Sequence, residues 1–531
     1  MKKVFLLLLL VLTLCTASSA ALPDRDIVIL YTNDVHCGVD ENLGYAAFSF
    51  CAEEARKSTP YVTLVDAGDF AQGETIGSIS QGRYIIQIMN QVGYDIVVPG
   101  NHEFDYGWAV FENFAKNLKS GFISCNMRDL RTGELIFKPY KILTYGSVKV
   151  AFVGVTTPES ITKSTPSSFM DEDKNLIYDF DGEKIIDSIQ KAVDSARAEG
   201  VDYVIIVGHL GNDGITEAWS SEYIARRTRG IDVFIDGHSH EVVPSMAVKN
   251  LDSQDVIITQ TGTKLINVGR LTINTEGKIK TELLNNFDGR DEKIVKFVDE
   301  IKSHFAGTMN THMSNTSFDL LAMDENGNWL LRNGETNLAD LVADAFLVSA
   351  RETKTRSADV AVVNAGTIRK NIKSGEITFF DVMNVLPFPN TICIFEVPGQ
   401  TLIDELEVGA RILPENFGGF LHVSGVTYTI DETVPSSVKL DEHKMFTGIE
   451  GKRRVSDVKI NGEPVDPEKM YKVVSTNYVL RERGDGHAFN GAKMIEADYG
   501  TLADSLAHYL KDFETLPERY RNPQGRIKFI K

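Results

Sequence analysis

Cysteine is scarce in this chain, with five residues among 531, and one of them, Cys15, falls in the apolar N-terminal segment. The remaining four show no paired Cys-x-x-Cys spacing, so the sequence predicts neither a zinc ribbon nor a disulfide framework. They are Cys37, Cys51, Cys125 and Cys393. Buried free thiols are the simplest interpretation, and a single disulfide is the alternative that the spacing leaves open.

Positive charge is also in short supply, with 55 lysines and arginines against 74 aspartates and glutamates, a net charge of −19. A general nucleic-acid binder needs a basic face for the phosphates, so the composition argues against binding to nucleic-acid polymers. The sequence also lacks the Gly-x-x-x-x-Gly-Lys-Ser/Thr phosphate loop. An anionic substrate would therefore need positive charge supplied locally, by bound metal ions and a few arginines.

Long apolar runs are missing except near Met1, where Val4–Leu14 is apolar and small residues follow through Ala21. This pattern predicts a secretory signal peptide over residues 1–21, whose apolar part is too short to span a bilayer comfortably. We therefore expect an exported protein, periplasmic, cell-surface or secreted, with no membrane span after signal cleavage. A retained anchor and a lipoprotein attached through Cys15 are the alternatives, although lipoprotein signals usually carry a residue smaller than Leu14 before the cysteine.

The chain is too long for one hydrophobic core, because domains usually hold about 100–200 residues. The sequence pattern changes near Asn286, and the charged stretch from Asp291 to His304 predicts a helix. We therefore expect four parts: a signal peptide (1–21), a first domain (22–290), a linker helix or hinge (291–315) and a second domain (316–531).

The first half repeats one pattern, in which a short β-branched, apolar run ends abruptly in a polar cluster. The runs are Ile27–Tyr31, Tyr61–Val65, Ile96–Val98, Tyr203–Val207, Ile231–Ile235 and Val256–Ile258. Runs this apolar predict strands buried on both faces, and helical stretches between several of them predict a layered α/β domain. Because ligands bind at the carboxyl ends of the strands in such sheets, the polar clusters should share one rim. The second half has its own strands and helices and predicts a separate α/β domain.

Seven side chains in these clusters are of types that bind divalent transition metals through carboxylate, imidazole or amide oxygen. They are Asp34, His36, Asp69, Asn101, His209, His238 and His240. Each residue alone is better explained as a turn or as a hydrogen-bonded polar group. Together they are enough for two sites, with an aspartate bridging both ions. Such a pair polarises a phosphoryl group and supplies a hydroxide for in-line attack.

The order of the motifs is more specific than any single one. They are Asp34-Val35-His36, Gly68-Asp69, Gly100-Asn101-His102-Glu103, Gly208-His209 and Gly237-His238-Ser239-His240. This order resembles the signature of the calcineurin-like metallophosphoesterases. The longer stretch from Gly100 to Asp105 resembles the bacterial 5′-nucleotidase and UDP-sugar hydrolase branch of that family.

The resemblance implies a fold, a cofactor and roles for individual residues. The fold is a four-layer β-sandwich flanked by helices, followed by a second α/β domain, and the cofactor is a pair of divalent ions, Mn, Zn or Co. Asp34, His36, Asp69 and His240 would hold one ion, and Asp69, Asn101, His209 and His238 the other, with Asp69 as the bridge. His102 would stabilise the charged transition state, and Asp105 would orient its imidazole and favour the charged form.

The second half resembles the C-terminal domain of the same branch. Asn364 to Arg369 resembles its Asn-Gly-Gly-Gly-Ile-Arg motif, with Ala365 and Thr367 in place of glycines, and Leu386-Pro387-Phe388 resembles its Leu-Pro-Phe. Gly484-Asp485-Gly486 resembles the end of a Gly-Gly-Asp-Gly loop, with Arg483 in the first glycine's place. The resemblance implies that six residues bind the substrate, with a nucleobase stacked between the two aromatic rings. They are Arg332, Asn364, Arg369, Phe388, Tyr478 and Asp485.

These observations predict a metal-dependent phosphoric-ester hydrolase that releases phosphate from nucleoside 5′-phosphates. Related enzymes on this scaffold cleave 2′,3′-cyclic nucleotides, 3′-nucleotides or UDP-sugar pyrophosphates, and the altered loops at Asn364–Arg369 and Arg483 fall in the pocket that would choose among these substrates. A surface adhesin is the alternative from another class, because Arg483-Gly484-Asp485 spells a receptor-binding tripeptide. Phosphatase activity after metal addition separates the two classes.

Overall fold

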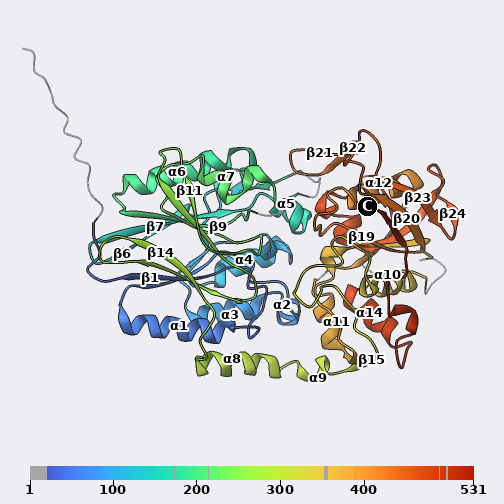
Figure 1. Ribbon diagram of the computed structural model, residues 1–531, viewed down its shortest axis with the longest axis horizontal. Helices are drawn as coiled ribbons and strands as arrows, with labels where there is room; N and C mark the ends of the chain where they lie inside the picture. Colours follow the sequence, from blue (N-terminus) through green and yellow to red (C-terminus); the bar gives the residue numbers. More distant parts are fainter. Residues whose placement is uncertain are drawn as a thin grey trace, which may run out of the picture.

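The computed structural model describes residues 21–171, 175–212, 215–351, 357–388, 390–489, 491–497 and 500–531. The predicted signal peptide, with Cys15, falls outside this part of the chain except for Ala21. Two α/β domains lie side by side, joined along one edge by a helical connector (Figure 1). No helix in the described ranges combines the length and the apolar composition that crossing a bilayer requires.

The first domain has two main sheets packed face to face. The described strands of one sheet run in the order β14 (Ile279–Leu284), β13 (Val268–Ile273), β1 (Ile27–Thr32), β2 (Val62–Asp66) and β3 (Ile96–Val97). Those of the other run in the order β11 (Val242–Lys249), β12 (Asp255–Thr261), β10 (Val233–Ile235), β9 (Tyr203–His209), β7 (Val148–Thr156) and β6 (Tyr140–Tyr145). A buried apolar cluster with members from both sheets fills the space between them.

Helices cover the outer faces of both sheets and complete four layers (Figure 1). On the first sheet these are α1 (Gly44–Ser58), α3 (Arg83–Val92), α4 (Trp108–Asn117) and α8 (Glu292–Ser303). On the second they are α6 (Ile185–Ala198) and α7 (Ser221–Ala225). The alternation along β1 shows why both faces need cover. Ile29 and Tyr31 pack between the sheets, whereas Val28 and Leu30 pack against the helices.

Parallel pairing brings the polar ends of the strands to one edge of each sheet. Thr32 pairs with Asp66 at the ends of β1 and β2, and Ile235 pairs with Val207 near the ends of β10 and β9. The residues that follow these positions in the two sheets face one another. The rim expected from the sequence is therefore built from two sheets.

The second domain has its own core and two main sheets. One contains β19 (Leu421–Ser424), β16 (Val360–Asn364), β25 (Met470–Thr476), β18 (Ile392–Pro398) and β26 (Lys493–Glu496), in that order. The other contains β24 (Glu463–Pro464), β23 (Val455–Ile460), β20 (Val426–Asp431) and β27 (Ile527–Ile530). Helices α10 (Asn337–Ser349), α11 (Phe379–Val385), α12 (Gly399–Gly409) and α14 (Leu502–Leu510) pack around them. Side chains cap the N-terminal ends of several of these helices, and Thr378 and Asp381 form a capping box on α11.

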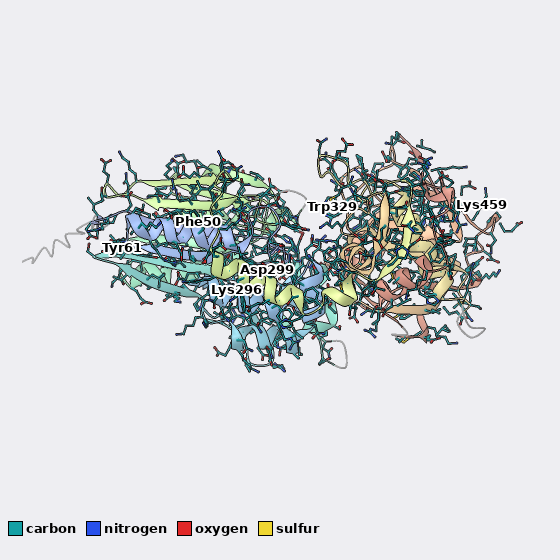
Figure 2. The ribbon with its side chains drawn as sticks, turned by 90° about the horizontal axis from the view of Figure 1, so that it is seen from below. Phe50, Tyr61, Lys296, Asp299, Trp329 and Lys459 are labelled. Carbon is teal, nitrogen blue, oxygen red and sulfur yellow. The ribbon has the colours of Figure 1, made fainter. Side chains whose placement is uncertain are left out.

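The connector is less separate from the first domain than the charge pattern suggests. Ile294, Val298 and Ile301 of α8 lie in the core of the first domain, while Lys296 and Asp299 face solvent on the underside (Figure 2). The chain then passes through α9 (Ala306–Met309) into β15 (His312–Thr316), which pairs with β17 (Gly375–Thr378) of the second domain. The crossing between the domains therefore falls on the few residues around α9.

Candidate metal centre and substrate cavity

Six of the seven candidate metal-ligand side chains meet in two overlapping groups. Asp34, His36, Asp69 and His240 form one, and Asp69, His209 and His238 form the other, with all ligand atoms of a group within 4.8 Å of one another. Asp69 belongs to both groups. Its Oδ2 lies 3.8 Å from His36 Nε2 and 3.1 Å from His209 Nε2. His240 Nε2 lies 3.4 Å from Asp34 Oδ1.

Hydrogen bonds to the backbone orient two of the imidazoles. His36 Nδ1 lies 2.9 Å from the Gln72 carbonyl oxygen, and His209 Nδ1 lies 2.7 Å from that of Ala67. In each case the Nδ1–H donates to the carbonyl, which leaves Nε2 as the basic atom that faces the cluster. His238 is held differently, because its Nε2 lies 2.9 Å from Glu159 Oε2.

Two buried acceptors in the cluster have no hydrogen-bond partner among the described residues. His209 Nε2 is one, because its approach to Asp69 lacks hydrogen-bond geometry, and Asn101 Oδ1 is the other. The Asn101 amide nitrogen, in contrast, donates to the Lys163 carbonyl over 3.5 Å. Buried polar atoms are almost always paired, so these two acceptors are suited to a cation. Together with the surrounding carboxylates and imidazoles they fit divalent transition-metal ions.

Five of the seven candidate ligand residues have a left-handed backbone. Their φ angles are 50° at Asp34, 45° at His36, 59° at Asp69, 78° at His238 and 59° at His240. This conformation costs of order 1 kcal/mol or more at a residue other than glycine, and it persists where surrounding contacts hold it. Backbone hydrogen bonds across the strand ends do so here. Asp34 N–H donates to Gly68 O and His36 N–H to Asp69 O, each over 2.9 Å.

Glu103 is a buried carboxylate that the motif contains but for which the sequence predicted no role. It accepts hydrogen bonds from the backbone N–H groups of Asp69 (2.8 Å), Phe70 (2.9 Å), Ala71 (3.0 Å) and Gly100 (2.7 Å). Burial and the charge of Asp69 raise the pKa of Glu103 to about 7, although the amide donors favour the ionised form. One side chain therefore fixes the loop after β2 and the turn after β3 together.

Replacing Glu103 by alanine should destabilise the fold and weaken metal binding. The change leaves four buried N–H groups without their acceptor, and each such group costs about 1–3 kcal/mol. We expect the free energy of unfolding, measured by denaturant titration, to fall by about 3 kcal/mol or more. Glu112→Ala, on the exposed face of α4, is the matched control and should change it by less than about 0.5 kcal/mol. Equal stability of the two variants would refute the role of Glu103.

His102 lies beside the metal cluster but belongs to neither group. Its Nδ1 is 2.6 Å from Asp105 Oδ2, and its backbone N–H donates to Asp69 Oδ1 over 2.8 Å. Burial lowers the pKa of His102, but the carboxylates of Asp105 and Asp69 outweigh it and leave the pKa raised. Ser164 Oγ donates to the other oxygen of Asp105 over 2.9 Å. The pair therefore presents an oriented imidazole that favours its charged form.

A cavity of about 550 Å³ joins this cluster to the second domain. Asp69, Asn101, His102, Asp105, His238 and His240 line its first-domain side. The six residues for which the sequence predicted substrate binding line the opposite side, namely Arg332, Asn364, Arg369, Phe388, Tyr478 and Asp485. Asp34, His36 and His209 are buried behind this surface.

The two arginines supply the positive charge that the composition lacks overall. Arg332 Cζ lies 4.2 Å from the centroid of the Trp329 ring, and Arg369 Cζ lies 5.5 Å from that of the Phe388 ring. Among the described residues, no carboxylate oxygen lies within ion-pair distance of either guanidinium. Burial and the neighbouring Arg369 lower the pKa of Arg332 to about 9, and its Nε has no partner in the described ranges. Figure 2 labels Trp329 at the edge of the second domain that faces the first.

The aromatic pair is asymmetric. Phe388 is half-buried, and its ring centroid lies 6.0 Å from that of His102. The position of Tyr478 is fixed by a hydrogen bond, because its hydroxyl donates to the Thr162 carbonyl of the first domain over 3.0 Å. Its ring also packs on Gly484, where an added Cβ would lie 2.1 Å from Tyr478 Cζ.

The departures from the family's loops have local explanations. The Thr367 hydroxyl donates to Asn364 Oδ1 and so fixes the amide that lines the cavity. Arg483 has a left-handed φ of 57°, and its guanidinium donates to the carbonyls of His487 (3.1 Å) and Phe446 (3.2 Å). Asp485 is buried and lies 3.3 Å from Lys163 Nζ. Within the Arg-Gly-Asp tripeptide, Asp485 is buried and lines the cavity, and the Arg483 guanidinium is bonded to backbone carbonyls, which argues against a receptor-binding role.

Sequence reasoning missed several residues of the cavity wall. In the first domain, Glu159 precedes the short helix α5 (Ser160–Lys163) and Lys163 is its last residue, and Arg411 and Phe417 belong to the second domain. Arg411 stacks on Phe417 at 4.0 Å and donates to the Asp485 carbonyl over 2.8 Å. The sequence held one local indication of this wall, the run Phe417-Gly418-Gly419. Gly419 packs against the Phe417 ring, where a side chain would not fit.

Three of the cysteines pack in or against the hydrophobic clusters of the first domain. Cys37, Cys51 and Cys125 are free thiols, which agrees with the simplest interpretation of their spacing. Cys37 follows a metal-ligand histidine, but burial raises the pKa of its thiol well above the usual value. The Sγ donates to the Phe70 carbonyl over 3.4 Å. A neutral thiol in this position is a poor metal ligand.

Comparisons with known proteins agree with this architecture. Residues 27–242 match the calcineurin-like phosphoesterase family, and residues 316–493 match the 5′-nucleotidase C-terminal domain. The chain is 27% identical over 563 residues to a 5′-nucleotidase of Diplobatis ommata, covering 97% of this chain and 92% of that one. It is 26% identical over 537 residues to the trifunctional nucleotide phosphoesterase protein YfkN of Bacillus subtilis (strain 168), covering 91% of this chain but only 34% of that longer protein.

A solved structure shows the same two-domain arrangement. The crystal structure of a 5′-nucleotidase precursor from Thermus thermophilus superposes with a TM-score of 0.78 at 25% identity, covering 95% of this chain and 99% of that one. The family resemblance and the fold class expected from the motifs are thereby confirmed. The chain belongs to the 5′-nucleotidase family of calcineurin-like metallophosphoesterases and is a phosphoesterase hydrolase.

Proposed function

We propose that this hydrolase is an exported 5′-nucleotidase that releases phosphate from nucleoside 5′-monophosphates. The observation that carries the proposal is the single cavity that has metal-ligand residues on one side and arginines with aromatic rings on the other. A nucleotide needs both, because its phosphate and its base differ in chemistry and lie several ångströms apart. Export is supported by the signal-peptide pattern of residues 1–21.

The first domain, residues 22–290, would hold two divalent ions, with Mn, Zn or Co as the candidates. Asp34, His36, Asp69 and His240 would bind one ion, and Asp69, Asn101, His209 and His238 the other. When bound, such a pair polarises the phosphoryl group and lowers the pKa of the attacking water. His102, held by Asp105, would donate to the phosphoryl oxygens as their charge increases in the transition state.

The second domain, residues 316–531, would bind the rest of the nucleotide. The guanidinium groups of Arg332 and Arg369 have no carboxylate partner among the described residues and are suited to phosphate oxygens, and Asp485 offers an acceptor to a sugar hydroxyl. Phe388 and Tyr478 would flank the base, a contact that contributes about 1–3 kcal/mol and tolerates different bases. Asn364, fixed by Thr367, would complete the wall. The connector, residues 291–315, would serve as the hinge between the two domains.

Phosphate release from a substrate panel tests the proposal. The panel contains nucleoside 5′-monophosphates, 3′-monophosphates, 2′,3′-cyclic nucleotides and UDP-sugars, each with and without Mn²⁺, Co²⁺ and Zn²⁺. We expect the highest kcat/KM with 5′-monophosphates and no turnover in a chelator. A preference for cyclic nucleotides or UDP-sugars would replace the 5′-nucleotidase with one of the alternatives on this scaffold.

Substitution of Phe388 tests the base contact. Phe388→Ala should raise the KM for AMP roughly tenfold, in line with the loss of one stacking contact. It should leave kcat/KM for p-nitrophenyl phosphate within about twofold, because that substrate lacks a nucleobase. Phe380→Ala, which removes an exposed ring from α11, is the control. Equal losses on both substrates would identify Phe388 as a packing residue.

A further inference from the structure

A cluster of four charged side chains crosses the domain interface outside the catalytic cavity. It contains Glu41, Glu74 and Lys264 of the first domain and Lys370 of the second, and we call it the Glu41 cluster. Lys370 Nζ lies 2.7 Å from Glu41 Oε1 and 3.8 Å from Glu74 Oε2. Lys264 pairs with the same two carboxylates, at 3.2 Å from Glu41 Oε2. Two positive and two negative charges therefore balance across the interface.

The cluster is partly buried, which sets it apart from an ordinary surface ion pair. The side chain of Glu74 is 10% exposed, and that of Lys370 is 40% exposed. Burial lowers the pKa of Lys370, but the charges of Glu74 and Glu41 outweigh it and leave the pKa raised. Ion pairs in such partly desolvated positions are screened less by salt than exposed ones.

Lys370 directly follows Arg369 in the chain, and the two side chains point in different directions from the backbone. Arg369 faces the cavity beside Phe388, whereas Lys370 faces Glu41 and Glu74. The guanidinium of Arg369 is buried without a carboxylate partner among the described residues, and burial lowers its pKa. Its one side-chain hydrogen bond within the described ranges is a long contact of 3.5 Å to the Gly366 carbonyl. Its own contacts therefore hold it weakly in the cavity.

The first-domain residues next to the cluster also hold the chain that carries Phe388. Glu74 immediately precedes helix α2 (Thr75–Ser80). Thr75 Oγ1 donates to Asn384 Oδ1 over 2.8 Å, and Ser78 Oγ donates to the carbonyl of Pro387, the residue before Phe388. One short stretch of the first domain thus contacts both segments that place substrate-facing side chains.

We propose that Lys370 is a positioning residue for phosphoester hydrolysis. Its ion pairs with Glu41 and Glu74 form when the two domains are apposed, and through the shared backbone they hold Arg369 against the metal side of the cavity. When the two domains come together, the same contacts therefore place the Arg369 guanidinium in the cavity. The proposal rests on the proposed function for the role of Arg369.

A set of matched variants tests the proposal on AMP and on p-nitrophenyl phosphate. Lys370→Met should lower kcat/KM roughly tenfold, the size of a typical coupling between contacting groups. Lys370→Arg should restore it to within about threefold of wild type, because it keeps the charge. Lys373→Met is the control, since it removes a surface pair with Asp319 (2.8 Å) three residues along the same segment, and kcat/KM should not change. Metal content and Tm should match wild type in all three.

A double-mutant cycle separates positioning from a general structural role. In an Arg369→Ala background, Lys370→Met should have less than a twofold further effect, because no guanidinium is left to position. A full tenfold loss in that background, or an Arg369→Ala variant with wild-type kcat/KM, would overturn the proposal. Should Lys370→Met fold poorly, Glu41→Gln removes the same ion pair from the first-domain side, with the same expectations.

Measurements on both AMP and p-nitrophenyl phosphate show whether a failure concerns the role of Lys370 or the proposed 5′-nucleotidase function. A wild type that hydrolyses p-nitrophenyl phosphate but not AMP contradicts the 5′-nucleotidase function and still allows the cycle to be measured. A wild type that hydrolyses both, with additive effects of the two substitutions, supports the nucleotidase and contradicts the role of Lys370.

Discussion

Replacing Asp69 by asparagine should empty both metal sites together. Asp69 belongs to both ligand groups, so its negative charge acts on both sites. Each of the other residues in these groups belongs to one group. We expect the loss of that charge to weaken both proposed sites, so that metal content falls toward none and not by half. Activity should fall by roughly 10³-fold or more, since bound ions supply several kcal/mol of transition-state stabilisation.

Metal analysis after gel filtration, together with phosphate release, measures this result. Asp299→Asn, an exposed aspartate on α8, is the chemically matched control and should keep both ions and full activity (Figure 2). A variant of Asp69 that keeps two ions and normal turnover would contradict the bridging role. Loss of one ion alone would assign Asp69 to a single site.

Replacing His102 by alanine should lower kcat by roughly 10²–10³, the usual loss for one transition-state donor. His102 lies outside both ligand groups, and its Nδ1 is engaged by Asp105 at 2.6 Å. The raised pKa of His102 favours an imidazolium, which repels a cation and attracts phosphoryl oxygens. KM should change less than kcat, because the contact strengthens as charge develops on the phosphoryl group.

Metal content separates this role from a ligand role. We expect His102→Ala to keep both ions, whereas His209→Ala, a matched histidine within the cluster, should lose metal. Asp105→Asn should give a smaller loss in kcat than His102→Ala, since it removes only the orienting charge. If His102→Ala loses an ion, His102 is a ligand and the role proposed here is wrong.

The strand ends were predictable because their signal is local. An apolar, β-branched run that stops at a polar residue defines the end of a buried strand without knowledge of its neighbours, as at β1 and β2. Which sheet each strand joins was not predictable, because a strand buried on both faces has the same pattern in either sheet. The assignment depends on pairings such as Val153 with Ile206, which are distant in the sequence.

The candidate metal-ligand residues could be proposed from the sequence because they follow these strand ends, whereas most of the cavity wall could not. Glu159 contacts His238 across about eighty residues, and Lys163 contacts Asp485 across the domain interface. Neither residue stands in a motif, and each acquires a place in the site through tertiary packing alone. Glu103 lay within a recognised motif, but a carboxylate that binds four backbone amides is visible only once the two loops are brought together.

The left-handed ligand residues have a consequence for how the enzyme is made. Protein contacts that do not depend on an ion hold several of them, such as the hydrogen bond from His36 Nδ1 to the Gln72 carbonyl and that from the Asp34 N–H to the Gly68 carbonyl. The chain can therefore complete its fold first and acquire metal afterwards, with little ordering left for the ion to drive. We expect metal to bind after folding, and one divalent ion to exchange for another without unfolding of the protein. We therefore expect the identity of the bound metal to follow the divalent ions that are available to the folded protein.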